Sequence, residues 1–341
     1  MSYTPPFIIT NEILNQVSLI SEIVGKLEVL APTAMTPTLR KANKIKTITG
    51  TLAIEGNTLG AEKVTAILEG KRVMGSMREI AEVNGAIAVY DKLSTLDHKR
   101  LDHLLQTHKL LMQEILTNAG NFRQSNVGVG GDEGVVHIAP PYGNVSGLMN
   151  ELFTWLAGTD LHPLIKSSVF HYEFEFIHPF IDGNGRMGRL WQSLILFEWK
   201  PIFSAIPIES VIKETQQGYY DALEAAGNSG ESTPFIEFML AAILSACEDE
   251  LKNGSNVPED VPKDVPKENA IALRLNKIMS LIEQDSKISI DQLARECDVS
   301  DKTIKRAIAK LKEQGVVTRQ GGMKHGDWVI MQSIKRNKNN E

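Results

Sequence analysis

The stretch His178-Pro-Phe-Ile-Asp-Gly-Asn-Gly-Arg-Met-Gly-Arg189 separates two runs of apolar residues that recur at helical spacing. The first helical pattern is expected to end at His178, because the following proline biases that residue away from helical backbone. Gly183 and Gly185 permit backbone turns that other residues resist. The second pattern begins near Arg186, so the glycine turn should lie at a helix N-terminus, where unpaired backbone N–H groups point outward. Such a terminus is a binding site for an anion.

Three charged side chains surround this turn. Arg186 and Arg189 are three residues apart and share one face of the helix, where two planar guanidinium groups suit phosphate oxygens. Asp182 offers a carboxylate to a divalent cation that bridges the same oxygens. Each feature is common by itself, because glycine turns, His-Pro helix ends and solvated arginine pairs occur widely. In this order they predict a site for a nucleotide polyphosphate with Mg²⁺.

The run is similar to the His-Pro-Phe-x-Asp-Gly-Asn-Gly-Arg-x-x-Arg signature of Fic-domain proteins, which mostly transfer AMP from ATP to a protein hydroxyl. The resemblance implies that His178 is the catalytic base, a role that suits an imidazole at neutral pH. It implies that Asp182 holds Mg²⁺ and that Arg189 holds the γ-phosphate. The nucleotide-binding residues that it implies around the turn are Gly183, Asn184, Gly185, Arg186, Met187, Gly188 and Arg189.

The segment Thr51-Leu-Ala-Ile-Glu-Gly-Asn57 resembles the [Ser/Thr]-x-x-x-Glu-[Gly/Asn] inhibitory motif of the same family. Thr51 and Glu55 are four residues apart and face the same way on a helix, and Gly56 can end that helix with a positive φ. The resemblance implies that Glu55 pairs with Arg189, takes the place of the γ-phosphate and holds ATP in an unproductive pose. Helix ends with this sequence pattern are common in proteins that have no inhibitory role. The inhibitory interpretation therefore depends on the position of this segment, which precedes an intact core motif in the chain.

Residues 124–138 carry β-branched residues on both sides of a glycine-rich middle, which predicts a β-hairpin. The resemblance implies that this hairpin is a flap whose edge pairs with the backbone of a target protein. Binding of that kind reads the target's side chains only weakly.

Two further aromatic positions have competing interpretations. Tyr220 lies in a segment similar to family segments that flank the adenosine, and core packing is the alternative role for it. His171 is expected to be a core histidine, because the pattern around it lacks the His-Glu-x-x-His spacing of a zinc helix.

The chain has 341 residues, a net charge of −6 and 42% hydrophobic residues, which is typical of a soluble globular protein with two or three domains. Helical periodicity dominates residues 1–251. We therefore expect a mainly α fold, with an N-terminal helical region at 1–100 that carries the inhibitory helix and a Fic-type core at 101–251. The absence of a long apolar run or a leader pattern predicts a cytoplasmic protein without a membrane partner. The oligomeric state stays open, a homodimer included.

Residues 252–268 repeat Val-Pro pairs between alternating charges, which predicts an extended linker. Beyond it, residues 269–335 show a helix, a helix-turn-helix pattern and two strands around a glycine tip, and this pattern resembles a winged-helix domain. Residues 269–341 hold 14 lysines and arginines against 9 acidic residues, a net charge of +5, which leaves −11 for residues 1–268.

In winged-helix folds the second helix of the pair enters the DNA major groove. DNA is therefore an expected partner of residues 291–330. Protein contact by the same domain is the alternative. The basic residues that would contact DNA phosphates are Lys302, Lys305, Arg306 and Lys310.

Two functions other than AMP transfer stay open. One is a DNA-binding regulator whose Fic core only senses nucleotide, although a sensor would not need a base such as His178. The other is removal of AMP from a modified protein, with Glu55 positioning the attacking water.

Overall fold

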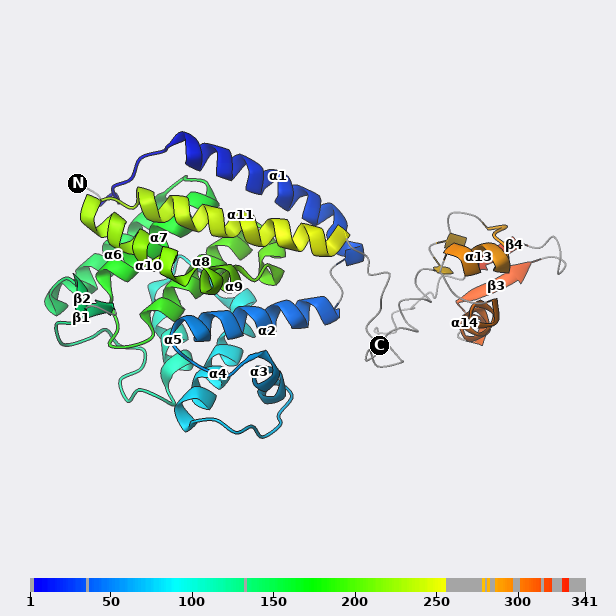
Figure 1. Cartoon of the computed structure of the whole chain (residues 1–341), viewed down its shortest axis with the longest axis horizontal. Helices are drawn as coiled ribbons and strands as arrows, with labels where there is room; N and C mark the ends of the chain where they lie inside the picture. The colour runs from blue at the N-terminus through cyan, green and yellow to red at the C-terminus, as the bar shows by residue number, and fades with distance from the viewer. Residues whose placement is uncertain are drawn as a thin grey trace, which may run out of the picture. The chain divides into compact units, whose positions relative to one another are not determined.

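The computed structural model describes residues 3–34, 37–131, 134–255, 278–279, 281–282, 286–296, 301–313, 316–320 and 327–330. The chain divides into two compact units, Met1–Val257 and Pro258–Glu341, and each has its own hydrophobic core (Figure 1). Helices dominate, as the sequence predicted. Among the described residues, none of the helices combines the length and apolar character needed to cross a membrane.

The first unit is helical apart from one hairpin. Two short 3₁₀ helices, η1 (Leu93–Thr95) and η2 (Pro201–Ala205), lie between its longer helices. The hairpin consists of β1 (Gly128–Gly131) and β2 (Gly134–Ile138), which pair antiparallel as predicted for the flap. The α-helices are α1 (Asn11–Ala34), α2 (Pro37–Ile54), α3 (Ala61–Leu68), α4 (Met77–Tyr90), α5 (Leu101–Met112), α6 (Tyr142–Gly158), α7 (Pro163–Ile177), α8 (Asn184–Trp199), α9 (Ile208–Glu214), α10 (Gln216–Ser229) and α11 (Thr233–Ser255).

Helices α7 and α8 form the centre of this unit and pack along each other. Helix α7 is buried on nearly all sides, and Phe170 and Phe174 are fully buried. A helix of this composition belongs in the interior of a protein. The loop of residues 178–183 joins the two central helices, so the core fixes the motif from both ends.

Helix α2 carries the predicted inhibitory residues to this centre. Its apolar residues Ile48 and Leu52 are buried, and it packs against α9 and η2. Gly56 follows the helix with φ 85°, so the predicted glycine termination is confirmed. The outermost pair, α1 and α11, run side by side (Figure 1). Helix α11 extends into the segment predicted as a linker, and residues 256–268 lie outside the described residues.

The second unit contains α13 (Ile290–Glu296), α14 (Asp301–Glu313), β3 (Val317–Gln320) and β4 (Asp327–Ile330). The two strands pair antiparallel, as the sequence predicted. Trp328 is buried in the small core, and its indole N–H donates to the carbonyl of Ile288 at 3.0 Å. The turn between the two helices and the tip between the two strands lie outside the described residues.

Candidate functional site

His178 ends α7 in a left-handed conformation, with φ 49°. It is the only non-glycine residue with a positive φ among the described residues. Such a conformation costs free energy and persists only where the surroundings fix it. The backbone N–H of His178 donates to the carbonyl of Phe174 at 3.0 Å, and its side chain is one-fifth exposed. The predicted base therefore lies at a sharp corner that the surrounding structure must hold.

Arg123 holds this corner from the base of the flap. Its guanidinium is buried and donates to the carbonyls of His178 at 2.8 Å, Ser125 at 2.8 Å and Pro140 at 2.5 Å. It also donates to Ile177 at 3.3 Å. Burial lowers the pKa of Arg123. One side chain thus joins both ends of the flap to the backbone that presents His178.

His108 supports the same loop from α5. Its ring stacks on Phe180, with centroids 3.6 Å apart and planes 2° from parallel. The N–H of Gly120 donates to Nδ1 at 2.9 Å, so Nε2 must carry the proton, and it donates to the carbonyl of Asp182 at 3.0 Å. Burial lowers the pKa of His108 to about 4, so the ring is neutral near pH 7. His108 therefore supports the loop from α5, a structural role that the sequence pattern did not indicate.

The turn at the start of α8 is held by Asn184. The amide of Asn184 accepts from the N–H of Phe180 and donates to the carbonyl of the same residue, both at 2.9 Å. Phe180 is fully buried. The first hydrogen bond of the helix runs from Met187 N to Gly183 O, so the preceding N–H groups have no acceptor within the helix. The side chain of Asn184 is used by the turn, so the group of Asn184 that can bind an anion is its backbone N–H.

Met187 is the predicted nucleotide contact that the geometry does not favour. Its side chain is fully buried in the core, and its N–H is bonded to Gly183. Neither group faces an anion at the helix N-terminus. The structure points to a packing role for this residue.

The carboxylate of Glu55 lies in this turn. A side chain at Gly185 would place its Cβ 2.2 Å from Glu55 Oε1, so the glycine leaves the space that the carboxylate takes. Arg189 donates to Glu55 Oε1 at 2.5 Å and to Thr51 Oγ1 at 3.0 Å. Burial acts to lower the pKa of Arg189, but Glu55, Tyr219 and Glu175 together raise it by more, so the pKa of the guanidinium lies above its usual value. The predicted contact between Glu55 and Arg189 is present.

Four alternating charges form a ring beside the turn. Arg78 of α4 donates to Asp182 at 2.7 Å and to Glu82 at 3.3 Å. Arg186 closes the ring, with nitrogens 2.9 Å from Asp182 and 3.3 Å from Glu82. Arg186 is buried, and its Nε has no hydrogen-bond acceptor among the described residues. Such an unsatisfied donor beside a helix N-terminus suits an additional anionic oxygen.

The donors present fit a magnesium ion at Asp182. Its carboxylate is partly exposed, in the loop that precedes the anion-binding turn. Magnesium in proteins is commonly held by one or two carboxylates together with substrate phosphates. Here the charge of Asp182 is balanced by Arg78 and Arg186, whose guanidinium groups can equally neutralise phosphate oxygens.

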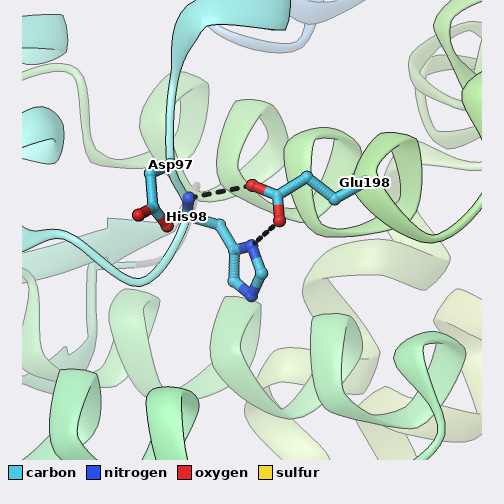
Figure 2. A group of neighbouring side chains, drawn as sticks. All are labelled: Asp97, His98 and Glu198. Atoms are coloured by element: carbon cyan, nitrogen blue, oxygen red, sulfur yellow. Dashed lines mark hydrogen bonds and ion pairs between the residues drawn. The ribbon is translucent and has the colours of Figure 1, made fainter.

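A second group of candidate metal ligands consists of Asp97, His98 and Glu198, with ligand atoms within 4.8 Å of one another (Figure 2). Glu198 lies 2.7 Å from Nδ1 of His98 and accepts from the backbone N–H of His98 at 3.2 Å. Asp97 accepts from the backbone N–H of Lys99 at 2.9 Å. Because these contacts already use the carboxylates, and Glu198 lies at the opposite end of α8 from Asp182, we interpret the group as structural.

Gly188 provides room for protein groups. A Cβ at this position would lie 2.8 Å from both Glu175 Oε1 and His171 Cδ2. The family resemblance implied that Gly188 binds the nucleotide, whereas in the structure the space beside it is filled by two side chains of α7. His171 is buried and bonded to Gln192 and Tyr219, so the prediction of a satisfied core histidine is confirmed.

Tyr220 lies on α10 beside the end of α2, and its ring is 44% exposed. Its hydroxyl lies 3.5 Å from the carbonyl of Ile54 and accepts from Gln216 at 3.2 Å. The exposure of Tyr220 therefore excludes the alternative interpretation, in which this residue packs in the core. A contact with a nucleotide base stays a prediction.

Comparison with known proteins places the motif in a family. Residues 96–196 match the model of the Fic/DOC family, and residues 274–326 match that of the DeoR-like helix-turn-helix domain. The solved structure of a Fic family protein from Desulfovibrio desulfuricans G20 is 38% identical and has a TM-score of 0.74, with 98% of this chain and 100% of that chain covered. Residues 134–508 of Fic-1 from C. elegans are 25% identical with a TM-score of 0.58, over 72% and 73% of the two chains.

Curated relatives carry the name protein adenylyltransferase Fic. The protein from Aedes aegypti is 32% identical over 215 residues, which are 59% of this chain and 41% of that protein. The protein from Drosophila melanogaster is 28% identical over 255 residues, which are 71% of this chain and 50% of that protein. The chain thus spans half or less of the length of these relatives.

Replacing Arg123 with Met should loosen the flap and the His178 corner together, because four backbone carbonyls lose their donor. We expect a loss of roughly 2–4 kcal/mol in the free energy of unfolding and faster amide hydrogen exchange in residues 124–131 and 178–183. Urea denaturation and exchange mass spectrometry would measure both. The control is Arg100→Met, which removes an exposed arginine paired with Asp102. Exchange equal to that of the control would contradict the role of Arg123.

Proposed function

The chain belongs to the Fic family, and on that premise we propose that it transfers AMP from ATP to a hydroxyl side chain of a target protein. In this reaction His178 takes the proton of a Ser, Thr or Tyr hydroxyl. The hydroxyl oxygen then bonds to the α-phosphorus, and the bond from that phosphorus to the oxygen of the leaving pyrophosphate breaks. A neutral imidazole is suited to this proton transfer at neutral pH.

The observation that carries the proposal is the contact between Glu55 and Arg189 at the N-terminus of α8. This helix end collects backbone N–H groups and a buried guanidinium, and a carboxylate of the chain itself lies among them. A place built for a negative group supports phosphate binding. The same contact supports autoinhibition, because ATP whose γ-phosphate cannot reach Arg189 would bind in a different pose.

The remaining phosphate contacts follow from the same turn. Arg186 and the N–H groups of Asn184 and Gly185 suit the α- and β-phosphates, and fixed donors of this kind stabilise the charge on a departing pyrophosphate. Mg²⁺ held by Asp182 would add positive charge to the same oxygens. Tyr220 would contact the adenosine with its exposed ring.

A target protein would bind along the flap of residues 124–138. A short two-stranded hairpin can accept another chain as an added strand, with backbone hydrogen bonds that do not depend on the target's sequence. Arg123 supports this proposal, because it ties the base of the flap to the backbone of His178. A segment paired with the flap would therefore be registered relative to the base.

We further propose that the second unit binds DNA. The match to a DeoR-like helix-turn-helix domain supports this, and so does the basic surface of α14, on which Lys305 and Arg306 are exposed. A helix of this kind contacts phosphates through lysine and arginine.

Replacing Glu55 with Gly should raise AMP transfer by between about 10-fold and 100-fold, because Arg189 is then free for the γ-phosphate. This range corresponds to the roughly 1.5–3 kcal/mol of a hydrogen bond between charged groups. Transfer would be measured with α-labelled ATP and Mg²⁺, by label on the chain itself and on lysate proteins. His178→Ala in the same background should remove the labelling.

A matched control is Glu69→Gly, because Glu69 also ends a helix before a glycine with positive φ. It should leave labelling unchanged. The double variant Glu55→Gly, Arg189→Ala should lose the gain. No increase in Glu55→Gly would contradict the inhibitory pair. AMP removal would be identified as the activity if the wild-type chain released AMP from a labelled protein and the Glu55→Gly variant did not.

Replacing Asp182 with Asn should remove most of the Mg²⁺ dependence of ATP binding, because a neutral amide attracts the cation less. We expect the ratio of ATP affinities with and without Mg²⁺ to fall by about tenfold, the equivalent of a charged contact of roughly 1.5 kcal/mol. Isothermal titration calorimetry would measure it. The control is Asp102→Asn, an exposed aspartate paired with Arg100. An unchanged ratio would remove Asp182 from the metal site.

Replacing both Lys305 and Arg306 with Ala should weaken duplex DNA binding by the full-length chain. The slope of log affinity against log salt should decrease by about 2, because two phosphate contacts each contribute about 0.9. Fluorescence anisotropy over a salt series would measure it. Lys63→Ala, an exposed lysine of α3, is the control. If the wild type binds no duplex at low salt, the domain is a protein-docking module.

A further inference from the structure

One buried carboxyl beside the site has no part in the reaction as proposed. Glu175 lies on α7, three residues before His178, and its side chain is 11% exposed. Its Oε2 is 3.9 Å from Nδ1 of His178, and its Oε1 is 3.9 Å from Nε2 of His171. Oε1 is buried without a hydrogen-bond partner among the described residues. An unsatisfied polar group in the interior costs free energy, so its presence needs a reason.

The surroundings of Glu175 are set by three other segments. Gly188 of α8 leaves the space for Oε1, because a Cβ there would lie 2.8 Å away. Burial raises the pKa of Glu175 to about 8, against the effect of Arg189 and with that of Glu55. Tyr219 faces the group from α10. Near neutral pH the carboxyl is therefore mostly protonated, with one oxygen that donates a hydrogen bond and one that only accepts.

Gln192 fixes the direction of the hydrogen bonds made by His171, the histidine next to Glu175. The hydroxyl of Ser168 donates to the carbonyl of Leu164 at 3.0 Å and accepts from the amide nitrogen of Gln192 at 3.5 Å. The amide oxygen of Gln192 therefore faces His171, 2.6 Å from Nδ1. Since that oxygen can only accept, Nδ1 of His171 carries the proton.

His171 then determines which oxygen of Glu175 is protonated. Burial lowers the pKa of His171 to about 3, so the ring is neutral and Nε2 is an acceptor. Nε2 accepts from the hydroxyl of Tyr219 at 3.1 Å and lies 3.9 Å from Oε1 of Glu175, so its single lone pair is shared between these two groups. An acceptor at this position favours the proton of Glu175 on Oε1. Oε2, the oxygen nearer to His178, is left as an acceptor.

We propose that Glu175 is a positioning residue for AMP transfer: its Oε2 accepts a hydrogen bond from Nδ1–H of His178 and leaves Nε2 of His178 unprotonated for the target hydroxyl. The inference rests on the proposed transfer function. The separation of 3.9 Å is longer than a hydrogen bond and closes by a small rotation of either side chain, and catalytic hydrogen bonds are commonly long before substrate binds. A partner that fixes the tautomer and orientation of a reacting imidazole is a recurrent requirement of general-base catalysis.

Two substitutions separate positioning from packing. Glu175→Met fills a similar volume without an acceptor, whereas Glu175→Gln reproduces a protonated carboxyl, with an oxygen for His178 and an NH₂ group for Nε2 of His171. In the Glu55→Gly background, the Glu175→Met substitution should lower the rate of AMP transfer by about 10- to 100-fold with an unchanged Kd for ATP. The Glu175→Gln substitution should retain the rate within about threefold. The control is Glu173→Met, which removes another buried carboxyl of α7, bonded to Tyr3.

The ring nitrogens of His178 supply a readout that does not depend on AMP transfer. In the Glu55→Gly chain, ¹⁵N NMR should show the Nδ1–H tautomer for His178, assigned by comparison with His178→Ala. Glu175→Met should give a mixture of tautomers, and Glu175→Gln should restore Nδ1–H.

Three results would overturn the inference: an Nε2–H tautomer in the Glu55→Gly chain, a Met variant as active as Glu173→Met, or equal losses in Met and Gln. If Glu55→Gly transfers no AMP, the proposed function fails, and the tautomer alone decides the role of Glu175.

Discussion

The site depends on a guanidinium that the fold buries and therefore must neutralise. Arg189 is 2% exposed in the central helix α8, and an unpaired charge at that depth costs several kcal/mol. Thr51 of α2 and Glu55, which directly follows this helix, are its partners, while Gln216 of α10 holds the end of the helix by donating to the carbonyl of Ile54 at 2.9 Å. The packing of the N-terminal helices against the core is thus coupled to the charge of one side chain of the motif.

The backbone at His178 imposes a second requirement. A left-handed histidine before a proline is strained, and it is fixed from two directions. Arg123 bonds the carbonyls around it, and His108 stacks on Phe180 and holds the carbonyl of Asp182. Rigid support of this kind is what a reacting side chain needs, because misplacement by about 1 Å can reduce a rate by about 100-fold. The strain is therefore consistent with the proposed role of the base.

The sequence predicted those parts of the site whose residues lie close together in the chain. The loop at His178, the anion-binding turn, the end of α2 at Gly56 and the hairpin all follow from local patterns of glycine, proline and apolar spacing. The contacts of His108, Arg123 and Glu82 with the motif could not be predicted this way, because the motif residues they contact are 55 to 104 residues away and the contacts depend on how helices pack. The same limit explains Gly188, whose neighbours His171 and Glu175 lie on α7 and could not be predicted from its own segment.

The separation of the two arginines explains how a chain could bind ATP and still be inhibited. Arg186 pairs with Asp182 and Glu82 and makes no described hydrogen bond to Glu55, and its Nε has no acceptor among the described residues, so in the proposed reaction it can still bind the α- and β-phosphates. Of the two arginines, Arg189 is the one that donates to Glu55, a group of the same chain, whose effective concentration does not fall on dilution. A nucleotide can then gain most of its binding energy without gaining the contact that orients the γ-phosphate. Inhibition of this form should lower the rate of the chemical step far more than the affinity for ATP, because binding and orientation depend on different side chains.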